Sequence, residues 1–143
     1  SLPEFLKARL DEDEQLARGA TEGPWKVSAE SAWANRGQEM ADVVTESAIK
    51  GTESPTVVAG DYEGFGAGTI PNAEHIACHD PARVLREVEA KRRMMAAHRP
   101  YDPDPDQACL GCAGGIEWER CPVLRSLASV HADHPDYQEA WRP

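Results

Sequence analysis

The stretch that decides the fold of this chain is CLGCAGGIEWERCP, residues 109–122. Cys109 and Cys112 are separated by two residues, and a loop of this kind can present two thiolates to one tetrahedral metal ion. Cys121 directly precedes Pro122, which predicts that it stands at the start of a helix. Exposed amide groups at a helix start favour a thiolate over a thiol. Three such sulfurs in one short segment predict a metal site, with zinc as the ion.

A zinc site needs a fourth ligand, and His98 is the candidate that the sequence favours. The helical pattern that begins at Pro81 puts His98 on the same face as Val88, at the C-terminal end of the helix. Cys78 is the competing ligand, because it is also a thiol. The predicted set is a Cys3His site closed to solvent, with Trp118 shielding its edge: His98, Cys109, Cys112 and Cys121.

Three other interpretations of the cysteines stay open at this point. A redox pair of the thioredoxin type would need a strand before it and a helix directly after it, whereas a proline-spaced linker, 101–106, precedes Cys109 and two glycines follow Cys112. Structural disulfides fit a secreted protein, and the chain does not open with a secretion leader. The third alternative is that the cysteines are close in sequence by chance.

Composition limits the class of protein. The 143 residues suffice for one domain, and they carry a net charge of −10 with few large aliphatic side chains. A core this thin would benefit from a metal staple. The acidic balance lacks the basic surface of a general nucleic-acid binder. Because there is neither a membrane-length apolar run nor a leader, we expect a cytoplasmic protein that does not bind membranes.

Periodicity and turn signals predict one α+β domain over residues 1–143. Short β-rich runs at 25–28, 41–45 and 55–59 favour strands, and the Gly-containing loops between them favour antiparallel pairing. The fold class we expect is a small antiparallel three-stranded sheet packed with about three helices, plus a zinc-stapled loop. The expected segments are an N-terminal helix over 1–20, a small sheet over 21–60, a long helix over 72–98, a zinc loop over 99–121, and a C-terminal helix with its tail over 122–143.

Local signals add detail to these helices. Asn72 is the expected N-cap of the long helix, and Asp80-Pro81 predicts a second cap inside it. The glycine-rich segment 60–71 is expected to be a flexible crossover loop. In the first helix the expected apolar stripe ends at Leu16, and the acidic run 11–14 is expected to form a solvated face. The aromatic tail residues Tyr137 and Trp141 are expected to pack back on the helices.

The histidines of the 72–98 segment suggest a second possibility. His75 and His79 are four residues apart and could share a metal ion, and His79-Asp80 is a pair also found in metal-dependent phosphohydrolases. Those enzymes need a further histidine and a distant aspartate, and a role as helix cap already accounts for Asp80. A small metal-dependent hydrolase built on His75, His79 and Asp80 is therefore an alternative, and not the reading that we favour.

Several stretches together resemble a family of small proteins of unknown function from streptomycetes, other actinobacteria and their phages. The stretches are EFLKARLDEDE at 4–14, ATEGPW at 20–25, HIACHDPARVLREVEAKRR at 75–93 and ADHPDY at 132–137, before the ending WRP at 141–143. The family commonly has a His at the end of the long helix, a Cys-x2-Cys and a Cys-Pro, which match His98, Cys109/Cys112 and Cys121-Pro122 here. Cys78 stands where relatives usually carry a basic residue. The resemblance implies a metal site and no known activity.

We expect, in sum, a zinc-binding module that acts by binding another protein, as a regulatory or accessory factor and not as an enzyme. A nucleic-acid-binding zinc protein is the second alternative, because basic residues cluster at one helix end and lie a few turns before it: Lys91, Arg92, Arg93 and Arg99, with Arg83 and Arg86. Glu87 and Glu89 interrupt this set, which favours a solvated helix face, so nucleic acid is an unexpected partner. We expect one structural Zn²⁺ per chain.

Overall fold

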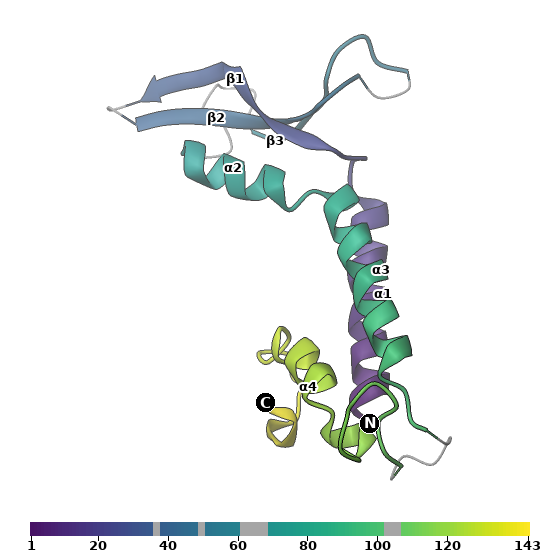
Figure 1. Cartoon of the computed structure of the whole chain (residues 1–143). Coiled ribbons are helices and arrows are strands. Elements are labelled where there is room, and N and C mark those ends of the chain that lie inside the picture. Colours follow the sequence, from purple (N-terminus) through teal and green to yellow (C-terminus); the bar gives the residue numbers. More distant parts are fainter. Residues whose placement is uncertain (36–37, 49–50, 61–68, 102–106) are drawn as a thin grey trace. The chain divides into compact units, whose positions relative to one another are not determined.

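The computed structural model describes residues 1–35, 38–48, 51–60, 69–101 and 107–143 (Figure 1). The chain divides into two compact units. The first, which we call the helical unit, consists of Ser1–Gln15 and Glu87–Pro143, and the second, the sheet unit, of Leu16–Arg86. Helices α1 (Leu2–Gly19) and α3 (Pro81–Ala97) contribute residues to both units. All four predicted metal ligands belong to the helical unit.

The sheet unit contains a three-stranded antiparallel sheet in the order β1-β2-β3. Its strands are β1 (Trp25–Asn35), β2 (Gln38–Thr45) and β3 (Val57–Ala59), which include or overlap the three predicted runs. Helix α2 (Ile70–Cys78) packs against β1 and β2 (Figure 1). Ala41, Val43 and Ala73 form the buried core between sheet and helix. Small and β-branched residues suit this position, because they allow a helix to approach a pleated surface closely.

Helix α2 begins earlier than the sequence predicts. Thr69 takes the N-cap position with extended backbone and Ile70 is the first helical residue, so the prediction of Asn72 as the cap is wrong. The cause is Pro71, whose fixed φ and missing N–H fit the first turn of a helix. Most of the segment predicted as a crossover loop, 60–71, lies outside the described residues.

Asp80 is the N-terminal cap of α3, as the Asp80-Pro81 pair predicts. One carboxylate oxygen accepts a hydrogen bond from the backbone N–H of Arg83 at 2.7 Å, and the other accepts one from the N–H of Trp25 at 3.1 Å. The carboxylate is buried. It thereby satisfies a free N–H in the first turn of α3 and joins the start of β1 to the start of that helix.

The α+β architecture is confirmed. The described residues form the three-stranded antiparallel sheet and four α-helices, of which the last is α4 (Pro122–Ser129). The sequence suggested about three helices, and the additional one arises at Asp80-Pro81. Because a proline cannot continue a preceding helix without loss of a hydrogen bond, the predicted 72–98 helix is divided into α2 and α3. None of the described helices is both long enough and apolar enough to cross a membrane.

The core of the helical unit lies among α1, α4 and the C-terminal tail. Phe5 is at its centre, with the Trp141 ring centroid 5.0 Å away and the Tyr137 centroid 6.1 Å away. This confirms that the aromatic tail packs back on the helices. The buried residues of this core are Leu2, Phe5, Leu6, Cys109, Cys121, Leu124, Ala128 and Trp141. Two of the candidate metal ligands are therefore core residues.

The end of the α1 stripe differs from the prediction. Leu16 is 70% exposed, whereas its neighbour Ala17 is buried. Ala17 lines a small pocket in the sheet unit together with Ala82 and Leu85 of α3. A small side chain at position 17 lets the two helices approach closely, and the bulkier leucine is left in solvent.

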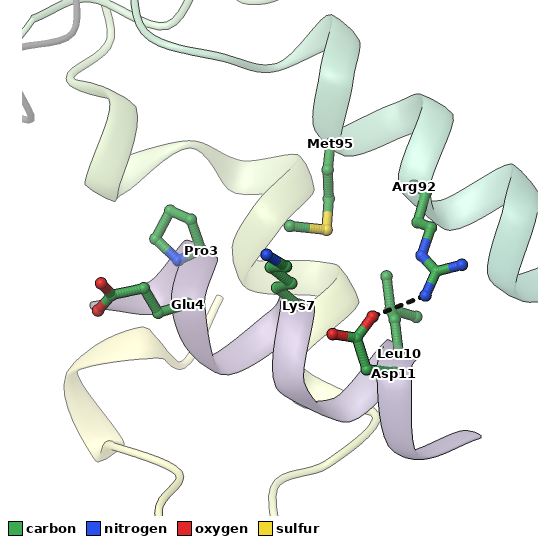
Figure 2. A pocket seen from close by; sticks show the side chains of 7 residues that line it. All are labelled: Pro3, Glu4, Lys7, Leu10, Asp11, Arg92 and Met95. Atoms are coloured by element: carbon green, nitrogen blue, oxygen red, sulfur yellow. Dashed lines mark hydrogen bonds and ion pairs between the residues drawn. The ribbon is translucent and has the colours of Figure 1, made fainter. Parts of the chain in front are cut away.

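The acidic run of α1 is more than a solvated face. Arg92 of α3 pairs with Asp11 at 2.7 Å and with Glu14 at 2.6 Å, and Arg9 pairs with Glu12 at 3.3 Å. Figure 2 shows Arg92 reaching across to Asp11. Asp11 and Arg92 also belong to the lining of a groove of about 640 Å³, which consists of Pro3, Glu4, Lys7, Leu10, Asp11, Arg92 and Met95. The two acidic side chains stay partly solvated, at 45% exposed for Asp11 and 23% for Glu14, but α3 supplies a cation for them that the local sequence of α1 does not reveal.

Candidate metal centre

Three separate segments of the helical unit supply the predicted ligands. His98 directly follows the last residue of α3, and its backbone N–H still donates to the carbonyl of Met94 at 3.0 Å. Cys109 and Cys112 lie in the loop after α3. Cys121 takes the N-cap position of α4, where its carbonyl accepts the N–H of Arg125 at 3.0 Å. Two helix termini therefore fix the first and last ligands, and the loop between them carries the other two.

The structure brings these four side chains together. The Nδ1 atom of His98 lies 3.5 Å from the sulfur of Cys109, 3.6 Å from that of Cys112 and 3.4 Å from that of Cys121. The sulfurs of Cys112 and Cys121 are 3.6 Å apart. All four candidate ligand atoms lie within 4.8 Å of one another. Each sulfur thus faces the same edge of the imidazole ring.

These spacings fit the edges of a metal-centred tetrahedron. With metal–sulfur bonds of about 2.3 Å, two sulfurs on a tetrahedral ion are about 3.8 Å apart, and a nitrogen ligand comes slightly closer. A disulfide would instead require about 2.05 Å between sulfurs. All four cysteines of the chain are free. The donor set and its geometry therefore suit a metal ion and leave the disulfide alternative without support.

Burial distinguishes the two sides of the cluster. Cys121 is 0% exposed and Cys109 is 2% exposed, so both sulfurs lie in the core of the helical unit. His98 and Cys112 are half-buried. The side of the site formed by Cys109 and Cys121 is therefore enclosed by the core. Its other side, formed by His98 and Cys112, is partly exposed to solvent.

Burial also affects the acidity of Cys112. It is the main cause that raises the pKa of the Cys112 thiol to about 12, and contacts with Cys121 and Cys109 add to the effect. Cysteine binds a metal as the thiolate, so an incoming ion has to displace these protons. A cation at the centre of the group supplies the compensating charge that the neighbouring thiols cannot supply.

Gly111 allows the histidine to approach the Cys-x2-Cys loop. A Cβ atom at this position would lie 2.7 Å from Nδ1 of His98 and 2.7 Å from the carbonyl oxygen of Ala97. Any larger residue would therefore displace the imidazole or the end of α3. The sequence shows Gly111 between the cysteines, but only the folded structure shows that the glycine faces the histidine.

Trp118 holds the same histidine from another side. Its indole N–H donates to the carbonyl oxygen of His98 at 2.8 Å, and its ring packs against the core. Trp118 begins a short 3-10 helix, Trp118–Arg120, and its carbonyl accepts the N–H of Cys121 at 3.1 Å. The tryptophan thus connects the first ligand with the last one. Sequence reasoning placed it at the edge of the site and missed the hydrogen bond.

The other candidate site residues lie outside this cluster. Cys78 is exposed on α2, where its sulfur accepts a hydrogen bond from Arg83 at 2.7 Å. The rings of His75 and His79 have centroids 4.4 Å apart and planes tilted by 41°, and Asp80 is occupied as a helix cap. Within the described residues, the His98 cluster is the one group of three or more potential ligands close enough to share an ion.

The basic cluster proposed for nucleic acid is partly neutralised within the protein. Arg92 is held by Asp11 and Glu14, and Arg93 pairs with Glu89 at 2.9 Å. Each arginine paired in this way has less charge available for a phosphate. The geometry thus gives little support to the nucleic-acid alternative.

Comparison with known proteins places the whole chain in one family. No curated protein and no solved structure gives a match. One family model does match, and it covers residues 1–143 without interruption. The chain, with its His98-Cys109-Cys112-Cys121 cluster, belongs to DUF6221, a family of unknown function.

Proposed function

We propose that the protein binds one zinc ion through His98, Cys109, Cys112 and Cys121, and that this ion has a structural role. The observation that carries the proposal is the convergence of three sulfurs and one imidazole nitrogen at tetrahedral spacing. Thiolates and imidazole together favour zinc over magnesium, calcium or manganese, which prefer oxygen ligands. Enough ligands are present to complete a tetrahedron, as in structural zinc sites.

The donor set argues for a structural ion and against a catalytic one. Catalytic zinc sites have three protein ligands and a water molecule in the fourth position. Here three thiolates and one imidazole would fill all four positions, and the negative charge of the thiolates would weaken the ion as a Lewis acid. The hydrolase alternative also lacks support. Each carboxylate oxygen of Asp80 already accepts a hydrogen bond from a backbone N–H group, so Asp80 serves as a helix cap and does not face a metal ion shared with His75 and His79.

The metal would substitute for apolar core that this chain lacks. Its ligands come from the end of α3, the following loop and the start of α4, and two of them are core residues. In small domains the free energy of metal binding contributes directly to the free energy of folding. The ion would therefore fix the loop and α4 against the rest of the helical unit.

We infer that the protein, with its metal ion bound, acts by binding a protein partner through its surface, as a regulatory or accessory module. The support is indirect: a candidate metal site with four protein ligands, a net charge of −10 and a basic cluster partly neutralised by ion pairs. Such a charge favours a partner with a basic surface, and it disfavours nucleic acid.

Metal content and coordination test the first part of the proposal. Elemental analysis of the purified chain should find about one zinc per molecule, and Cys112→Ala should lose it while the matched control Cys78→Ser keeps it. After cobalt substitution, the absorption bands of a tetrahedral thiolate site should not respond to added azide. Bands that shift with azide would reveal an open position and contradict a structural role.

Capture of partners from the native host tests the second part. A tagged chain should retain a specific protein, and Cys112→Ala should lose that protein if the metal-stapled unit forms the binding surface. The control is again Cys78→Ser. Equal capture by Cys112→Ala would separate the interaction from the metal site, and binding of duplex or single-stranded DNA in its place would favour the nucleic-acid alternative.

A further inference from the structure

The outward face of α2, in the sheet unit, has a second pair of potential metal ligands. His75 is in the last turn of α2 and His79 is its C-cap residue, four positions later, so the two side chains are neighbours on one side of the helix. Both side chains are exposed, whereas Ala73 and Ile76 pack toward the sheet. The pair shares no residue with the His98 cluster, so a site here is independent of the proposed zinc ion.

A hydrogen bond fixes the protonation and the orientation of the His79 ring. Its Nδ1 atom lies 2.8 Å from the backbone carbonyl oxygen of His75. Because a carbonyl oxygen can only accept, Nδ1 carries the proton of the neutral ring and Nε2 has the free lone pair. Histidines that bind metals generally donate their other ring N–H to a carbonyl or carboxylate oxygen in this way. The Nε2 atom of His79 is therefore arranged as a ligand atom.

The spacing of the two rings fits a shared ion. Their centroids are 4.4 Å apart. With metal–nitrogen bonds of about 2.0–2.1 Å, two imidazoles on one ion have centroids about 4.5 Å apart at a ligand angle of about 90°, and about 5.2 Å apart at the tetrahedral angle. The observed separation is close to the first value. The His75 ring makes no hydrogen bond to any residue that the structure describes, so it is free to turn its Nε2 atom toward the ion.

The neighbouring side chains do not complete this site. The sulfur of Cys78 accepts a hydrogen bond from Arg83, and each carboxylate oxygen of Asp80 accepts one from a backbone N–H group. Among the residues that the structure describes, no third potential ligand lies close enough to share an ion with the two histidines. An ion bound here would keep its other coordination positions for water or for a donor atom of another molecule.

We propose that His75 and His79 form a second metal site, which binds a late divalent transition-metal ion of the Cu²⁺ or Ni²⁺ type through two imidazole nitrogens. Imidazole suits both ions, and their tetragonal or octahedral geometries have ligand angles of about 90°. Zinc prefers the tetrahedral angle, at which the rings would lie farther apart. The bound ion is exchangeable, because only two exposed side chains hold it.

The experiment is an NMR titration of the purified full chain with Ni²⁺, because Cu²⁺ can oxidise the exposed thiol of Cys78. Paramagnetic Ni²⁺ should broaden the ring signals of His75 and His79 together, and the effect should saturate at one added ion per chain. The ring signals of His131 and His134 should stay sharp at that point. Elemental analysis follows the zinc content separately, so a failure of the zinc proposal would be recognised by itself.

Variants of α2 test the two-histidine arrangement. His75→Ala and His79→Ala should each weaken Ni²⁺ binding about tenfold or more, since a single imidazole loses the advantage of linked ligands. The matched control adds Glu74→His to His75→Ala. It keeps two histidines at exposed positions, but five residues apart and on different sides of the helix, so it should not restore the affinity.

Three results would overturn the proposal. Equal broadening of His131 and His134 would mean that Ni²⁺ binds single histidines without a shared site. Unchanged affinity in either alanine variant, or full affinity in the variant with the shifted histidine, would contradict joint binding by His75 and His79. Tighter binding of added Zn²⁺ than of Ni²⁺ at these two rings would contradict the assignment to an ion with ligand angles of about 90°.

Discussion

At the scale of the single residue, the geometry of the candidate metal centre depends on Gly111, which has no side chain. Gly111 brings the main chain of the Cys-x2-Cys loop against the imidazole of His98, and a Cβ there would come within 2.7 Å of the ligand atom. Metal sites tolerate deviations of only about 0.2 Å in ligand distance. The glycine is therefore as important to the geometry as a ligand, although it binds nothing itself.

Substitution of this glycine gives the first prediction. Gly111→Ala should weaken zinc binding by about 10- to 100-fold, the range found when groups that orient a ligand are lost. The measurement is competition with a chromogenic chelator. Gly19→Ala is the matched control, since a Cβ at Gly19 meets nothing within 4 Å. Unchanged affinity in Gly111→Ala would show that His98 does not bind the metal through Nδ1.

His131 gives a prediction on pH. Burial is the main cause that lowers the pKa of His131 below its ordinary value of 6.5, and the nearby charges of Lys91 and Arg9 also lower it, while Asp13 opposes them. At His131 the unfolded chain therefore binds a proton more readily than the folded chain does. Above about pH 6.5 the ring is neutral in both states and does not change the free energy of unfolding. As the pH falls from there toward the folded pKa, His131 lowers the free energy of unfolding.

An NMR titration of the histidine rings should place the His131 midpoint below that of an unstructured histidine. In urea unfolding, the loss of stability between about pH 7.5 and about pH 5.5 should be smaller for His131→Gln than for the unaltered chain. The comparison between the two proteins removes the shared effect of acid on the metal ligands. A midpoint at or above the ordinary value would contradict the prediction.

At the scale of the element, Asp80 sets the beginning of α3. Asp80→Ala should destabilise the protein by about 1–3 kcal/mol, because it removes a helix cap and leaves the N–H of Trp25 without its acceptor. Asp80→Asn should lose less stability than Asp80→Ala, since its amide oxygen can still accept from the N–H of Arg83, whereas its NH2 group cannot accept from the N–H of Trp25. Urea unfolding measures both variants. Equal losses in the two variants would contradict the role of Asp80 as a helix cap.

At the scale of the whole molecule, the two units should respond differently to loss of the metal. All four candidate ligands lie in the helical unit. A chelator should therefore increase hydrogen exchange first in the loop after α3, in α4 and in the C-terminal tail. Exchange in the β1–β2 hairpin should change little, because its core of Ala41, Val43 and Ala73 contains no ligand. Mass spectrometry of peptides before and after chelation measures this, and a uniform increase would contradict it.

Local sequence by itself determined most of the elements and the composition of the candidate metal cluster. Periodicity, caps and prolines act within a few residues, so they identified α1, α3, α4 and the strands, and the Asp80-Pro81 break was visible in the same way. The cysteine spacing and the position of His98 at a helix end were sufficient to choose the four residues that the structure brings together. The start of α2 was misjudged because Pro71 and Asn72 are both good first-turn signals, and local reasoning chose the wrong one.

Only the tertiary structure decided which side chains support that cluster and which charges are free. The glycine at 111 faces His98 because α3 ends against the loop, and Trp118 reaches the His98 carbonyl over a separation of twenty residues. Arg92 neutralises acids of α1 that lie about eighty residues earlier in the chain. Such contacts depend on how elements distant in sequence pack together, and short-range propensity contains no information about that packing.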